Sequence, residues 1–142
     1  MNTYFDTSAL AKRYLIEEGT DSVLKIYLQT EVICVSHIGY AEMIAVFHRK
    51  NMENKKNGKN FNAEIKRFKE DWEDFSLINV DENLHSILDK ILEKYPLRGS
   101  DAIHLASAIA TSLKLSGDLI FASADEKLLK AASAEHLSIY TC

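Results

Sequence analysis

The stretch Asn2-Thr3-Tyr4-Phe5-Asp6-Thr7-Ser8 decides how the rest of the chain is organised. Its first half is rich in β-branched and aromatic residues, which predicts a short buried strand. Asp6 follows at once, and a helical pattern begins after it. An aspartate at such a turn commonly caps the new helix. Ligand sites also gather at the carboxyl ends of strands in α/β sheets, so a catalytic role for Asp6 stays open.

Strand and helix patterns alternate along the whole chain. Apolar runs predict further strands at Val32–Val35, Leu77–Val80, Leu119–Ala122 and Leu137–Tyr140. Helical patterns fill the intervals, beginning with Ser8–Glu17 and including His37–Asn51, Phe61–Phe75 and a long alanine-rich helix from Ala102. This alternation predicts an α/β sandwich around a mostly parallel sheet.

Composition limits the class of protein. The 142 residues fit one domain spanning 1–142, and a chain of this length can bury a stable core without disulfides. The net charge of −4 argues against a protein that coats nucleic acids, which would be basic overall, but does not exclude a nuclease. Cys34 and Cys142 have no metal-binding spacing.

The opening residues form a strand pattern, not the charged and then apolar pattern of a signal peptide. No apolar run approaches the ~20 residues that a membrane span needs. We therefore expect a cytoplasmic protein with no membrane partner.

Glu42 lies in the helical pattern that follows the second strand. It stands four residues after Ile38 and four before Val46, so it falls on or beside the apolar stripe of that helix. A charged side chain there must be paired or bound to something. A salt bridge to Arg49, a solvated position at the edge of the stripe, and a functional role all remain open.

The second informative stretch is Leu97-Arg98-Gly99-Ser100-Asp101-Ala102-Ile103-His104-Leu105-Ala106. Small and apolar residues on nearly every side predict a central buried helix. Asp101 stands in its first turn, where the helix dipole favours a carboxylate. We interpret His104, one turn later, as a hydrogen-bonded core residue in preference to a metal ligand.

The stretch Phe121-Ala122-Ser123-Ala124-Asp125 repeats the opening pattern of an apolar strand followed by an aspartate. Because the carboxyl ends of parallel strands lie along one edge of a sheet, four acidic side chains can converge there. They are Asp6, Glu42, Asp101 and Asp125. Clustered carboxylates repel one another unless a cation joins them, and oxygen ligands select Mg²⁺ or Mn²⁺. Such an ion can activate water for hydrolysis of a phosphodiester, which is our functional hypothesis.

The region between residues 51 and 69 is the most basic part of the chain. Its cations are Lys55, Lys56, Lys59, Lys66, Arg67 and Lys69. They form either a solvated face or a surface that contacts phosphates.

The motifs strand-Asp-Thr-Ser-Ala-Leu, Ala-Glu, Ser-Asp-Ala-Ile-His-Leu-Ala-Ser-Ala and Phe-Ala-Ser-Ala-Asp-Glu-Lys-Leu occur in this order. Together they resemble the PIN-domain family, and within it the VapC-type toxins of toxin–antitoxin pairs. The resemblance covers nearly the whole chain. It implies a three-layer α/β/α sandwich with a mostly parallel five-stranded sheet.

The resemblance also implies an Mg²⁺- or Mn²⁺-dependent endoribonuclease. Its metal-binding and catalytic residues would be Asp6, Glu42, Asp101 and Asp125, which match the acidic positions of the family. Ser8 and Ser123 match positions at which the family often places a supporting hydroxyl. The expected partners are an RNA substrate, an antitoxin protein and a second copy in a homodimer.

Two other functions compete with this hypothesis. One is a phosphotransfer enzyme with Asp6 as phosphoacceptor, but Ser8 stands where haloacid-dehalogenase phosphatases need a second aspartate. The other is a non-catalytic PIN-like module that binds RNA or protein. The four retained carboxylates favour the enzyme over the binding module.

Overall fold

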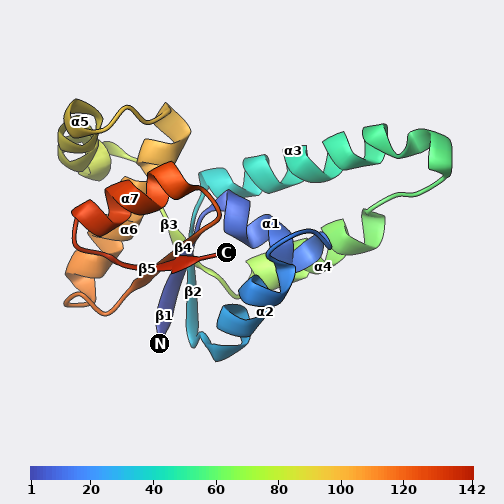
Figure 1. Ribbon diagram of the computed structural model, residues 1–142, viewed down its shortest axis with the longest axis horizontal. Coiled ribbons are helices and arrows are strands. Elements are labelled where there is room, and N and C mark those ends of the chain that lie inside the picture. Colours follow the sequence, from blue (N-terminus) through green and yellow to red (C-terminus); the bar gives the residue numbers. More distant parts are fainter.

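The computed structural model describes residues 1–142. The chain forms five strands with one or two α-helices between successive strands, seven α-helices in all. Figure 1 shows how these elements are arranged in space. The strands are β1 (Asn2–Phe5), β2 (Val32–Ser36), β3 (Ser76–Ile78), β4 (Ile120–Ser123) and β5 (Ser138–Thr141). The helices are α1 (Thr7–Tyr14), α2 (Thr20–Gln29), α3 (Ile38–Glu53), α4 (Asn62–Trp72), α5 (His85–Lys94), α6 (Gly99–Lys114) and α7 (Glu126–Ala134), with 3-10 turns at Lys55–Asn57 and Glu82–Leu84. No helix has both the length and the apolar character required to cross a membrane.

All five strands pair in parallel in the order β3-β2-β1-β4-β5. This confirms the predicted five-stranded sheet, which contains no antiparallel strand. From β1 the chain proceeds outward to β2 and β3, and then crosses to β4 and β5 on the other side of β1. The direction of winding therefore reverses at β1, and in such sheets ligands bind outside the carboxyl ends of the strands at the reversal.

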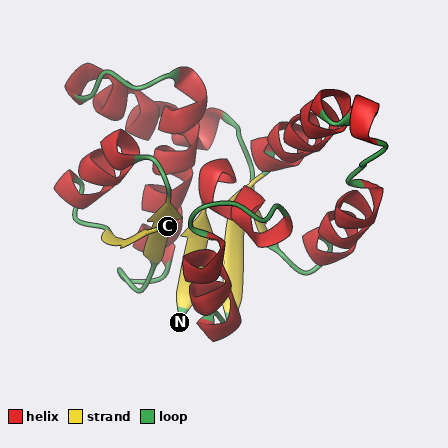
Figure 2. Cartoon of the chain, turned by 45° about the vertical axis from the view of Figure 1, so that its right-hand side comes forward, coloured by secondary structure: helices red, strands yellow, loops and turns green.

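Helices cover both faces of the sheet (Figure 2). Two consecutive residues of β1 pack against helices on opposite faces. Side chains alternate between the two faces of a strand. Tyr4 packs among residues of α5, α6 and α7, where its ring stacks on Phe121 with the centroids 5.6 Å apart. Phe5 packs on the other face, among residues of α1, α2, α3 and α4. The expected three-layer sandwich is confirmed.

Helices α3 and α4 form a hairpin that projects away from the sheet (Figure 1). The fully buried ring of Phe68 holds the base of this hairpin against α1, with ring centroids 5.5 Å from Tyr14 and 5.8 Å from Phe47. The basic cations of residues 51–69 lie along the hairpin and are all exposed. The chain turns near Gly58, which adopts a left-handed φ of 66°.

Several predicted bounds were wrong. The third strand spans Ser76–Ile78 instead of Leu77–Val80, so Asn79 and Val80 follow it. Helix α1 ends at Tyr14 instead of Glu17, because Leu15 takes an extended conformation that places its side chain in the core. On α3, the small residues Ala41 and Ala45 are exposed. The larger side chains on that helix, above all Met43 and Phe47, occupy the buried face instead.

Candidate active site

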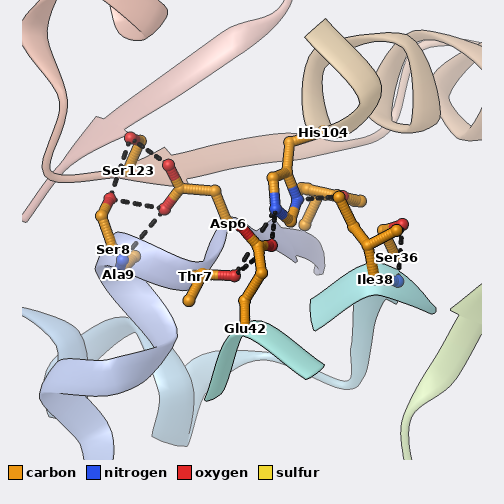
Figure 3. Close-up of polar contacts among 10 residues, drawn as sticks. Asp6, Thr7, Ser8, Ala9, Ser36, Ile38, Glu42, His104 and Ser123 are labelled. Atoms are coloured by element: carbon orange, nitrogen blue, oxygen red, sulfur yellow. Dashed lines mark hydrogen bonds and ion pairs between the residues drawn. The ribbon is translucent and has the colours of Figure 1, made fainter. Parts of the chain in front are cut away.

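Asp6 follows β1 at the centre of the sheet and caps α1. Its Oδ1 accepts hydrogen bonds from the backbone N–H of Ala9 at 2.9 Å and from the hydroxyl of Ser8 at 2.7 Å. Its Oδ2 accepts a hydrogen bond from Ser123, the last residue of β4, at 2.6 Å. Figure 3 shows these contacts, which join the ends of two neighbouring strands around one carboxylate.

The carboxyl group of Asp6 is buried more deeply than a helix cap requires. Asp6 is only 3% exposed. An N-cap needs only a side-chain oxygen that accepts a hydrogen bond from a free N–H group of the helix, and this does not require burial. Burial raises the pKa of Asp6 from its usual value, and the hydrogen bond from Ser123 and the nearby charge of His104 offset this only in part. The fold therefore holds a carboxylate in a position that disfavours its charge.

Glu42 faces the same region from the second turn of α3. Its Oε1 accepts a hydrogen bond from the hydroxyl of Thr7 at 2.8 Å and lies 2.6 Å from Nε2 of His104 (Figure 3). Burial acts to raise the pKa of Glu42, but the hydrogen bonds from His104 and Thr7 and the charge of His104 hold it below its usual value. The partner of Glu42 is therefore a histidine of α6, not Arg49 of its own helix.

His104 links Glu42 to the sheet. A carboxylate only accepts, so Nε2 of His104 carries a proton and donates it to Glu42. Nδ1 lies 2.7 Å from the hydroxyl of Tyr4 and accepts from it when the imidazole is neutral. His104 is 3% exposed, which confirms its prediction as a hydrogen-bonded core residue. The chain of contacts fixes the orientation of the Glu42 carboxylate.

Asp101 and Asp125 line one hollow of about 430 Å³ at the starts of α6 and α7. Asp125 caps α7 by accepting a hydrogen bond from the backbone N–H of Leu128 at 3.1 Å. Burial raises the pKa of Asp101, and the negative charges of Asp125 and Glu42 add to this. Three of the predicted carboxylates therefore influence one another electrostatically.

The donor chemistry of this region fits a hard divalent cation. The carboxylates and the flanking hydroxyls offer only oxygen, the ligand that Mg²⁺ and Mn²⁺ prefer. A cation would relieve the repulsion that helps to raise the pKa of Asp101. No three histidine, cysteine, aspartate or glutamate side chains lie close enough together to hold one ion. Mg²⁺ commonly binds one or two carboxylates and keeps several waters, which suits this wider spacing.

The sequence predicted the acidic side chains but not two of the hydroxyl groups in their hydrogen-bond network. Thr7 and Tyr4 were interpreted only as parts of a helix start and a strand. Their partners Glu42 and His104 lie 35 and 100 residues away in the sequence. No local pattern reveals a pairing over such a separation, although a hydroxyl directly after a strand-end aspartate was a usable hint.

Comparison with known proteins agrees with this architecture. A family model described as PIN domain matches residues 3–134. The chain is 28% identical over 137 residues to two proteins from strains of Mycobacterium tuberculosis, Ribonuclease VapC45 and Ribonuclease VapC49. Each alignment covers 92% of this chain and 89% of the relative.

A similar fold occurs in the crystal structure of VapBC2 from Rickettsia felis bound to a DNA fragment from their promoter. The superposition has a TM-score of 0.65 and covers 100% of this chain and 99% of the other. The two sequences are 13% identical, so the likeness concerns the fold alone.

Proposed function

This chain belongs to the PIN domain family, and on that basis we propose that it is an Mg²⁺-dependent endoribonuclease that hydrolyses RNA phosphodiester bonds. Mn²⁺ is expected to replace Mg²⁺, because both are hard ions that take oxygen ligands. The proposed metal-binding and catalytic residues are Asp6, Glu42, Asp101 and Asp125. The observation that supports the proposal is that Asp6 and Asp125 follow neighbouring parallel strands at the reversal point of the sheet. The negative charges of Asp125 and Glu42 also act on Asp101 and raise its pKa.

The chain's own residues would bind and orient the reacting groups. A divalent ion in this region supplies a Lewis acid for the phosphate and lowers the pKa of a bound water. Ser8 and Ser123 hold the carboxylate of Asp6 through hydrogen bonds of 2.7 and 2.6 Å. His104 and Thr7 hold Glu42 from two sides. These contacts limit the rotation of two proposed ligands before any ion arrives, which reduces the entropy lost on binding.

The relatives support RNA as the substrate and an antitoxin as a partner. Two relatives that align with most of this chain are named ribonucleases, and the Rickettsia felis protein was crystallised as VapBC2. We accordingly propose that the chain is the toxin of a type II toxin–antitoxin pair, inhibited by a separate antitoxin protein. We also propose that it forms a homodimer, which its sedimentation velocity would test.

A non-catalytic PIN-like module that binds RNA or protein is the second candidate. The observation in its favour is that no three acidic or histidine side chains lie close enough together to hold an ion. The two candidates differ in metal binding, because a module that only binds a macromolecule has no need of Mn²⁺.

The experiment is Mn²⁺-dependent cleavage of single-stranded RNA by the purified chain. Asp101→Asn is the test variant, because Asp101 makes neither a cap contact nor an ion pair, and the substitution preserves its size. Asp89→Asn, at an exposed position on α5, is the matched control. We expect cleavage by the parent and the control and none by Asp101→Asn. Full activity of Asp101→Asn would contradict the proposed site.

A further inference from the structure

Two cations share the hollow that contains Asp101 and Asp125. Arg98 and Lys127 line it together with Pro96 and Leu97. Arg98 precedes α6, and Lys127 lies in the first turn of α7. The hollow, at about 430 Å³, lies within the range of ligand sites, which extends from about 300 to 1,000 Å³.

No ion pair accounts for the position of either cation, although the charge of Arg98 lowers the pKa of Asp101 in part. The six ion pairs of the chain include neither Arg98 nor Lys127, and both side chains are exposed. Each stands at the start of a helix, where the helix dipole disfavours positive charge. A cation that only stabilised α6 or α7 would stand in the last turn instead.

The backbone that carries Arg98 is constrained. Pro96 fixes its own φ, and the N–H of Leu97 donates to the carbonyl of Tyr95 at 2.9 Å. The carbonyl of Arg98 accepts from the N–H of Ala102 at 2.9 Å, the first bond of α6. The side chain of Arg98 therefore extends from a constrained backbone position beside Asp101.

We propose that Arg98 and Lys127 form a subsite for a phosphate of the RNA next to the phosphate that is cleaved. This inference rests on the proposed function, because RNA is the anion that must approach the four carboxylates. An acidic region repels a polyanion, and two free cations at its rim offset that repulsion. The guanidinium of Arg98 can bind two phosphate oxygens at once, whereas the ammonium of Lys127 acts as a point charge.

The test is the affinity of the protein for a fluorescein-labelled single-stranded RNA of mixed sequence, measured by anisotropy. The variants are Arg98→Ala and Lys127→Ala, built in an Asp6→Asn background to prevent cleavage; asparagine caps a helix as well as aspartate does. The matched controls are Arg49→Ala and Lys130→Ala, which remove exposed cations outside the hollow. In a second set of titrations, Arg98→Ala and Lys127→Ala are built without the Asp6→Asn substitution, and EDTA prevents cleavage by removing divalent ions. This set does not depend on the Asp6→Asn background.

We expect Arg98→Ala to raise the Kd for RNA about tenfold, because the substitution removes one charge-assisted hydrogen-bonding contact. The slope of log Kd against log salt concentration should fall by about 0.7 for each cation removed, the value for single strands. Arg98→Lys should recover part of the affinity, because it retains the charge but not the paired donors. The two controls should bind RNA within about twofold of the parent.

Affinity and salt slope that stay unchanged in both alanine variants would overturn the subsite, as would a parent that binds no RNA. A lower melting temperature with unchanged RNA affinity would also overturn it, because the cations would then serve only to offset repulsion between Asp101 and Asp125. Failure of the nuclease proposal is distinct. A parent that binds RNA through Arg98 and Lys127 without cleaving it in Mn²⁺ would contradict the proposed activity and leave the subsite intact.

Discussion

Replacing His104 by alanine should destabilise the fold strongly, because its ring connects three elements. Its two nitrogens contact Tyr4 of β1 at 2.7 Å and Glu42 of α3 at 2.6 Å, and the residue itself lies on α6. Tyr4 is fully buried, so its hydroxyl would lose this partner in a place that water does not reach. Glu42 would keep only the hydrogen bond from Thr7.

The contacts give the size of the loss. A buried polar group left without its partner costs about 1–3 kcal/mol, and the carboxylate loses a charge-assisted bond worth about 1.5–3 kcal/mol. The space left by the ring adds a cavity cost that partial collapse reduces. Since these contributions overlap, we expect His104→Ala to lower the free energy of unfolding by about 3–5 kcal/mol. For a chain of 142 residues that corresponds to a fall in Tm of about 10–17 °C.

Urea unfolding at neutral pH, followed by circular dichroism, measures this loss. Tyr4→Phe removes only the hydroxyl and should cost about 1–2 kcal/mol. His48→Ala, at an exposed position on α3, is the control and should stay within about 0.5 kcal/mol of the parent. A loss below about 1 kcal/mol in His104→Ala would refute the reasoning, because it would mean that the buried contacts contribute little.

Three further results are expected. Burial raises the pKa of Asp6, so the stability from this group is present in acid and is lost as the pH rises through the raised pKa. Asp6→Asn should therefore gain in Tm relative to the parent as the pH rises above the usual aspartate pKa of about 4, and a difference in Tm that does not depend on pH would contradict this. His104 and Thr7 lower the pKa of Glu42 against the effect of burial. The parent should therefore be more stable than Glu42→Gln at pH values above the usual glutamate pKa, and it should lose this advantage on acidification, as melting curves across pH would record. Gly19→Ala should lower the free energy of unfolding in urea by about 1–2 kcal/mol, because φ at this position is +94° and a Cβ would lie 3.0 Å from the backbone carbonyl carbon of Cys142. An unchanged urea midpoint would contradict this, since it would show that the backbone before α2 adapts to the added Cβ.

The parallel sheet and the place of the strand-end aspartates could be predicted from sequence, because both depend on local patterns. Asp6 and Asp125 each follow a short apolar run directly, and a strand followed by a cap residue is visible within a few positions. The structure gives both the same local role, as N-caps of α1 and α7. The core was predictable for the same reason, since Phe121 and its neighbours form a continuous apolar run.

The partners of Glu42 and His104 could not be predicted, because they depend on how separate elements pack. The sequence indicated that Glu42 needed a partner and that His104 would be hydrogen-bonded, but not that each was the partner of the other across 62 residues. Arg98 and Lys127 carry no periodic or spacing pattern at all. They become notable only when α6 and α7 bring them to the same hollow as the carboxylates.

Calorimetric titration of Mn²⁺ tests the central claim, that the carboxylates at the carboxyl edge of the sheet bind a divalent ion. The parent, Asp6→Asn and Asp101→Asn would be compared under identical conditions, with Asp89→Asn as the exposed control. We predict saturable binding by the parent and the control, weakened at least about tenfold in both site variants. A parent that takes up no Mn²⁺, or site variants that bind it as tightly as the parent does, would contradict the account.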